Sequence, residues 1–159
     1  MKVALVLTVA VALAVSVIPA ATASRYDEVK KVAVEIVYLN ANSRYGDVWA
    51  YLHPRYKRVT NRAFWESCKR TLAKKRGLEF FDVRATDAYP DRVTLPLLGT
   101  IPVIAVTLQA HYLNHREGVD GGVGSASDTH LFVRVGSEWK ALWTPEQYRA
   151  YKAHRCPAT

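Results

Sequence analysis

The spacing of apolar residues changes from helical to alternating at Gly77. Before this glycine, apolar side chains recur at every third and fourth position over Tyr26–Asn40 and again over Tyr45–Leu52, which predicts amphipathic helices. After it they recur at every second position, most clearly over Ile104–Tyr112, which predicts strands. Helices followed by antiparallel strands are typical of an α+β domain whose helices pack on one face of a curved sheet.

Capping residues and prolines predict three N-terminal helices and a short C-terminal one. Pro54 ends the second helix because the residue before a proline, here His53, is driven out of helical geometry. Thr60 is the expected cap of a third helix, which ends at Gly77. Pro145 suits the first turn of the last helix.

Turn residues divide the second half of the chain. Pro90-Asp91 and Gly99-Thr100 predict turns between strands, and Gly136-Ser137 predicts a two-residue hairpin loop. The glycine-rich segment 118–127 predicts a mobile hairpin tip. One sheet of several antiparallel strands is therefore expected after Gly77.

Residues 1–23 have the parts of a secretory signal peptide. A basic start at Lys2 precedes the apolar run Val3–Ile18, and Ala21-Thr22-Ala23 gives the small residues of a cleavage site after Ala23. The alternative is an uncleaved membrane anchor, but the run is shorter than the roughly 20 residues that a helical span needs. We therefore expect a secreted protein without stable membrane insertion, in which residues 24–159 form a single domain.

The chain has two cysteines, Cys68 and Cys156. In an oxidising compartment an even pair in a small domain favours a disulfide over two free thiols. Without a third cysteine or a close spacing, the pair does not predict a zinc site. No motif for a metal, a cofactor or a catalytic residue is found, so none is predicted.

Several motifs resemble those of the nuclear transport factor 2-like superfamily. The closing hairpin reads G-x-x-W-K over Gly136–Lys140, and the W-x-x-LHP of Trp49–Pro54, the F-x-x-x-C of Phe64–Cys68 and the terminal Cys156 look like secreted bacterial members. The resemblance implies a cone-shaped, cystatin-like fold and a homodimer formed through the outer sheet face. It leaves function open, since the superfamily includes ketosteroid isomerases, polyketide cyclases, dehydratases and members that only bind.

Four residues are candidates for ligand binding, each with a structural alternative. Trp49 lines a pocket or packs in the core, and His53 binds a ligand or satisfies a helix end. His111 and His130 face each other if the hairpin between them is symmetric about Asp120-Gly121, because both are equally far from that centre. In that arrangement the two histidines would share a ligand or an ion. The structural alternative is that they lie on a solvent-exposed or dimer-forming face of the sheet.

The favoured function is a secreted, non-enzymatic binding or structural domain whose partner is a small molecule, an anionic polymer or a protein. The alternative is an isomerase or cyclase-type enzyme. An enzyme of that kind needs a carboxylate, histidine or tyrosine with a shifted pKa facing a cavity. A cone filled by Trp49 and Phe81 would argue against it.

Charge gives the first testable expectation. Lys and Arg outnumber Asp and Glu by 22 to 14, and basic residues cluster over Arg55–Arg76, without resembling a specific nucleic-acid motif. We expect weak binding to heparin or acidic vesicles that is lost at high salt, because the screening length falls from about 10 Å at 0.1 M to about 3 Å at 1 M. Binding that does not change with salt would leave the charge with a role in solubility alone.

Overall fold

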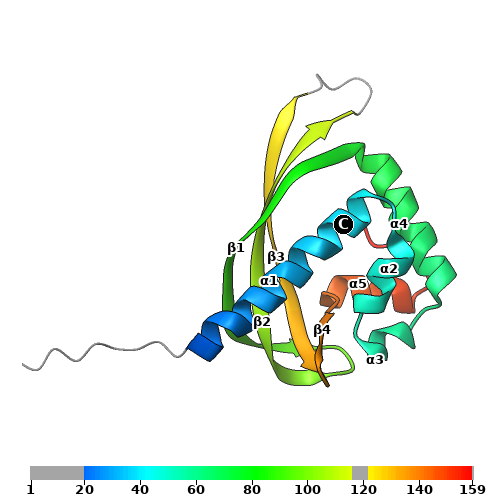
Figure 1. The fold of residues 1–159 in the computed structure, drawn as a ribbon. Helices are drawn as coiled ribbons and strands as arrows, with labels where there is room; N and C mark the ends of the chain where they lie inside the picture. Colours follow the sequence, from blue (N-terminus) through cyan, green and yellow to red (C-terminus); the bar gives the residue numbers. More distant parts are fainter. Residues whose placement is uncertain (1–19, 116–121, 159) are drawn as a thin grey trace, which may run out of the picture.

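The computed structural model describes residues 20–115 and 122–158, and these form an α+β domain (Figure 1). Within those ranges, helices come first, an antiparallel sheet follows, and a short helix closes the chain. The elements are α1 (Ala20–Ala41), α2 (Tyr45–Tyr51), α3 (Pro54–Lys57), α4 (Arg62–Arg76), β1 (Leu78–Leu95), β2 (Gly99–Asn114), β3 (Val123–Val135), β4 (Glu138–Ala141) and α5 (Pro145–Lys152). The predicted α+β class with an antiparallel sheet is confirmed. Four described helices precede the sheet instead of the predicted three, because α3 is a single turn that the sequence pattern does not predict.

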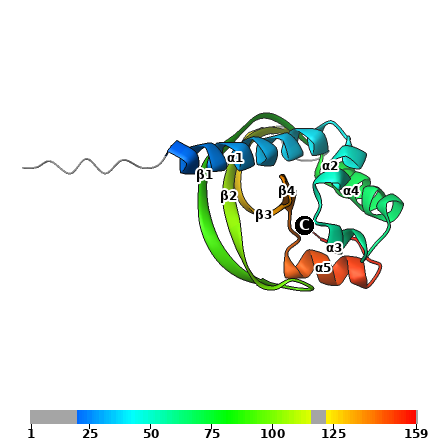
Figure 2. The same ribbon diagram turned by 60° about the horizontal axis from the view of Figure 1, so that its bottom comes forward.

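The four strands form one antiparallel sheet in the order β1-β2-β3-β4. Figure 2 shows that β1, β2 and β3 curve strongly and that the helices lie on the concave side. The register of β1 against β2 shifts between Phe80 and Asp82 and again between Ala85 and Asp87. Such irregularities bend a strand and increase its twist, so they contribute to the curvature.

The core lies between the concave face of the sheet and the helices. In α1 the buried residues follow the predicted stripe and include Val29, Ala33 and Ile36. Val29 and, at the centre of β2, Val106 are fully buried. In α4, Trp65 and Cys68 are buried, whereas Phe64 is only partly buried. The core face of α4 is thus centred on Trp65.

The ends of α4 and the start of α3 follow capping chemistry. The side-chain oxygen of Asn61, not the expected Thr60, accepts a hydrogen bond from the backbone N–H of Phe64 at 2.8 Å. Gly77 ends the helix as predicted, with a left-handed φ of 59° that favours glycine. His53 caps α3 through its Nδ1 atom, which accepts from the backbone N–H of Arg55 at 3.2 Å.

One predicted turn is wrong, and two others differ in their bounds. Pro90-Asp91 lies inside β1, where a proline is tolerated because β1 is an edge strand and one side of its backbone faces no partner. Of the predicted hairpin tip, Val123 to Ser127 belongs to β3, Gly122 precedes the strand, and residues 118–121 lie outside the described residues. The turn predicted at Gly99-Thr100 lies earlier, at residues 96–98, and Gly99 and Thr100 begin β2. Val135 pairs with Glu138 across the predicted two-residue loop.

The predicted signal peptide lies mostly outside the described residues, which begin at residue 20. The expected cleavage site after Ala23 falls in the first turn of α1. Among the described residues, no helix has the length and apolar character needed to cross a membrane. Secretion stays a prediction.

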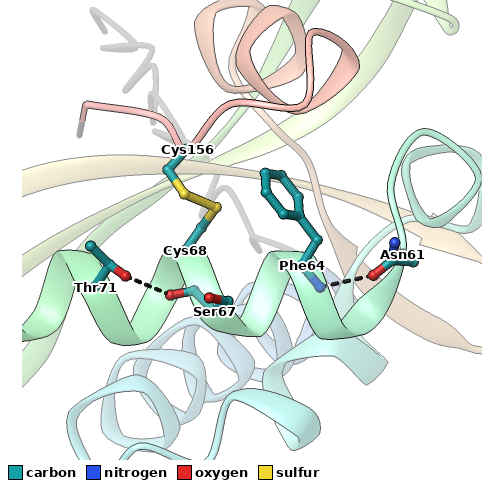
Figure 3. The surroundings of a disulfide bond; sticks show 6 residues. All are labelled: Asn61, Phe64, Ser67, Cys68, Thr71 and Cys156. Atoms are coloured by element: carbon teal, nitrogen blue, oxygen red, sulfur yellow. Dashed lines mark hydrogen bonds between the residues drawn. A yellow bond between two sulfur atoms is a disulfide. The ribbon is translucent and has the colours of Figure 1, made fainter.

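The predicted disulfide is present between Cys68 on α4 and Cys156, which follows α5 (Figure 3). Their Cα atoms are 5.2 Å apart, within the usual range for such bonds. Next to the bond, the ring of Phe64 stacks on His154 with ring centroids 4.0 Å apart. The C-terminal segment is therefore held to α4 by one covalent bond and one ring contact.

We expect the Cys156→Ser variant to be less stable because it releases a loop of 88 residues in the unfolded chain. The chain-entropy treatment puts the loss at about 4–5 kcal/mol as an upper figure. Urea denaturation of the variant and the oxidised wild type measures it, with dithiothreitol-treated wild type as the matched control. An unchanged midpoint in both would show that the bond does not stabilise the fold.

Candidate functional site

A cavity of about 360 Å³, here called the chamber, lies between α1, α4 and the concave face of β1, β2 and β3. Its wall is mostly apolar and includes Val37, Leu72, Phe80, Val83 and Leu108. The size and the apolar lining are those of small-molecule sites in proteins. Phe81 and Trp49 do not line it, and Phe81 is 52% exposed because it lies at the register shift in β1.

A second, more open groove adjoins the chamber on the side of α5. It is lined by polar residues at the start of α5, including Glu146 and Arg149, and by side chains of α4 and β3. Five residues line both the chamber and the groove, and we call them the neck: Lys69, Leu72, Arg76, Asp128 and His130. The apolar chamber thus meets the polar groove at a set of four ionisable side chains.

Lys69 comes from α4, directly after the disulfide-bonded Cys68. Burial, helped by the nearby charge of Arg76, lowers the pKa of its ammonium group from 10.5 to about 8. Within the described part of the chain, no carboxylate forms an ion pair with it. Its Nζ atom lies 5.5 Å from the centre of the Trp65 ring, a weak cation–π contact.

His130 and Asp128 reach the neck from β3, on the face that also buries Phe132. Burial lowers the pKa of His130; the Asp128 carboxylate opposes this shift and Lys69 adds to it. The Nε2 atom of His130 is 3.6 Å from an oxygen of Asp128; the His130 side chain is 41% exposed and that of Asp128 is 80% exposed. At neutral pH the imidazole is therefore neutral and able to accept a proton.

The neck carries a net positive charge. Lys69 and Arg76 are cationic, and Asp128 is the one carboxylate among the five neck residues. The chamber wall also holds the polar residue Asn40: its amide oxygen is buried without a hydrogen-bond partner among the described residues, while its Nδ2 donates to the carbonyl of Ile36 at 2.8 Å. The arrangement suits a mostly apolar guest with an anionic or polar end.

The predicted pairing of His111 with His130 is wrong. His111 pairs with Ser125, and His130 pairs with Val106. These pairs place the centre of the hairpin nearer to β2 than the predicted centre at Asp120-Gly121. Side chains alternate along a strand, so the changed register also places the two histidines on opposite faces of the sheet. His111 lies on the convex side, 3.9 Å from Asp82.

Trp49 and His53 lie away from the neck. Trp49 is partly buried and packs against Trp65 with ring centroids 5.4 Å apart. His53 caps α3, and its pKa is lowered by burial and then by Arg55 and Arg58. Neither residue lines the chamber or the groove, so of the four predicted binding residues only His130 does so.

Sequence reasoning missed Lys69, Arg76 and Asp128. Lys69, Leu72 and Arg76 recur at the spacing of one helix face, which is the signal that could have found them. The sequence pattern favours instead a solvent-exposed role for Lys69 and Arg76, because positive charges are stabilising near the C-terminus of a helix.

Comparison with known proteins identifies no relative: no family model, no curated protein and no solved structure matches the chain. No group of three or more histidine, cysteine, aspartate or glutamate side chains that could hold a metal ion occurs among residues 20–115 and 122–158. The candidate site therefore has to be judged on its own chemistry.

The buried ammonium predicts a pH-dependent stability. Since the pKa of Lys69 is lower in the folded than in the unfolded chain, the unfolded state holds more protons between about pH 8 and 10.5, and stability rises with pH in that window. We expect Lys69→Met to raise the free energy of unfolding at pH 7 by about 1–3 kcal/mol. The gain shrinks toward pH 10, where the wild-type amine is neutral.

Urea denaturation at pH 7, 9 and 10 measures this difference. The matched control is Lys74→Met, which changes an exposed lysine on the same helix and leaves the pH dependence as in the wild type. A Lys69→Met protein no more stable than the wild type at pH 7 would mean that the ammonium is well solvated.

Proposed function

We propose that this protein is a binding domain for a small molecule with an apolar body and one anionic group. The apolar body would fill the chamber, and the anionic group would lie at the neck, against Lys69 and Arg76. The observation that carries the proposal is the ammonium group of Lys69, which lies half-buried at the junction of an apolar cavity and a polar groove without a carboxylate partner in the described residues.

The charge of Lys69 favours an anionic ligand on energetic grounds. Burying an ammonium without a partner destabilises a fold, and a protein usually supplies a carboxylate beside it. Here the neighbouring cation Arg76 lowers the pKa of Lys69 further. A ligand carboxylate would remove both penalties, and the hydrogen bond between two charged groups would contribute about 1.5–3 kcal/mol to binding.

The apolar body follows from the chamber wall. Side chains from α1, α4 and three strands surround it, and the amide oxygen of Asn40, which has no hydrogen-bond partner among the described residues, is one polar point at which a ligand donor could bind. Displacing water from such a wall is favourable at about 25 cal/mol per Å² of apolar surface. A chain of about eight carbons ending in a carboxylate is a suitable test ligand.

A proton-transfer enzyme of the isomerase or cyclase type is the second candidate, and His130 favours it. Its imidazole lines both the chamber and the groove, and burial keeps it neutral near pH 7. Trp49 and Phe81 do not fill the cavity, so the condition that would argue against an enzyme is not met. A bound substrate with an acidic C–H at the neck would lie beside a base.

The proposal also covers the superfamily, the secretion and the oligomeric state of the protein. The resemblance to the nuclear transport factor 2-like superfamily and its cone shape are supported by the helix-then-strand order and the curved sheet. Secretion is supported by the disulfide together with the N-terminal sequence. A homodimer through the convex sheet face would bury Tyr89, which is 42% exposed there.

Isothermal titration with octanoate and octanol tests the proposed function. We expect octanoate to bind more tightly than octanol, and Lys69→Met to weaken octanoate at least tenfold, as the loss of a charged hydrogen bond predicts. Lys74→Met is the control and should bind as the wild type does.

Equal affinity for both ligands, or an unchanged affinity in Lys69→Met, would contradict a role for the ammonium. Native mass spectrometry of protein purified from its producing cell would then identify what it carries. A ligand recovered unchanged supports a binding domain, whereas a mixture of substrate and product isomers supports the enzyme.

A further inference from the structure

We propose that Lys69 is a nucleophile that forms an imine with carbonyl compounds, so that aldehydes or ketones with an apolar chain are a ligand class of this site. The inference rests on the proposed function, since it needs the chamber to hold the chain. It adds a covalent step at one atom, the Nζ of Lys69.

The first argument is the freedom of the Nζ atom. Lysine side chains inside proteins are usually held by a carboxylate or a carbonyl oxygen. Lys69 has neither partner within residues 20–115 and 122–158, and its nearest recorded contact is the face of the Trp65 ring at 5.5 Å. After loss of one proton, the electron pair of the amine is therefore available to a guest in the chamber.

The second argument is the set of charges around this amine. Arg76 lies on the same helix; Asp128 and His130 face the neck from β3; Glu146 and Arg149 line the groove from α5. The apolar surroundings and Arg76 favour the neutral amine. These are the two conditions under which proteins activate a lysine for attack on carbonyl groups.

The lowered pKa greatly increases the fraction of Lys69 that carries a neutral amine. A pKa of about 8 in place of 10.5 raises the neutral fraction near pH 7 by roughly 300-fold relative to a surface lysine. A carbonyl compound that reacts equally fast with every neutral lysine would therefore react mostly at position 69. Site selectivity is the property that an experiment can measure.

The reaction balances with groups at the neck. The Nζ electron pair forms a bond to the carbonyl carbon while the π electrons of the C=O bond move to oxygen. The neutral imidazole of His130 carries one proton from nitrogen to that oxygen, which gives a carbinolamine. It then carries the second nitrogen proton to the hydroxyl group as the C–O bond breaks and the C=N bond forms, so the oxygen leaves as water. Amine and carbonyl thus give imine and water, with no oxidant or reductant, and the open groove lets the water leave.

The position of the neck decides where the carbonyl lies. With an alkyl chain inside the chamber, the first polar atom of the guest lies where Lys69 and His130 line both spaces. A carboxylate at this point would pair with the ammonium form, and an aldehyde would react with the amine form. The two ligand classes would therefore compete for one site.

Octanal with sodium cyanoborohydride tests the inference, because the reductant converts an imine to a stable secondary amine. Peptide mass mapping after brief treatment at pH 7 should find octyl groups on Lys69 at least tenfold above any other lysine. Labelling of Lys69 should rise with a midpoint near pH 8. Octanoate should protect Lys69, and His130→Gln should slow its labelling.

Two variants make the result unambiguous. Lys69→Met should remove the selective label, and Lys74→Met should keep it; thermal melting shows whether each is folded. Equal labelling of all lysines, or a midpoint near pH 10, would overturn the imine. If octanoate binds and octanal is not trapped at Lys69, the imine fails and the proposed function stands. If neither probe binds, both fail.

Discussion

The packing of α1 and α4 against the concave face of a curved sheet is the interaction on which the rest of the structure depends. Where helix and sheet lie close, Val29 and Val106 are fully buried and the core is continuous. The sheet curves along its length, with register shifts in β1 that assist the bend, whereas the helices are straight rods. A straight helix cannot follow a curved surface throughout, and the chamber is the space left between them.

The disulfide and the candidate site share one turn of α4. Cys68 points to the core side and is bonded to Cys156, while the next residue, Lys69, lines the neck. The covalent bond also holds the segment that follows α5. The first residues of α5 line the groove. A fixed position of α4 relative to α5 keeps the groove open beside the chamber. The stabilising bond thus offsets part of the cost of partly desolvating the ammonium of Lys69.

The proposed binding and the proposed proton transfer at the neck draw on the same two groups. Burial pushes both Lys69 and His130 toward their neutral forms, since a low-dielectric wall disfavours either cation. A neutral imidazole accepts protons, and a partly neutral amine attacks carbonyl carbon. An anionic ligand would have the reverse effect and restore the ammonium. The chemistry at the neck therefore depends on what occupies the chamber as much as on the protein.

The sequence by itself determined those features that depend on neighbouring residues. The helical stripe of α1, the left-handed Gly77, the hairpin at Gly136-Ser137 and the start of α5 at Pro145 are local effects of side-chain spacing and backbone preference. The disulfide followed from there being two cysteines. Tertiary structure decided the register of β2 against β3, because strand pairing depends on contacts between distant residues and a small shift moves a side chain to the other face. The register that the tertiary structure imposes therefore separates His111 from His130. Tertiary structure also brought Lys69 and His130 to one neck, since only the folding of α4 across the sheet places these two half-buried side chains against the same cavity.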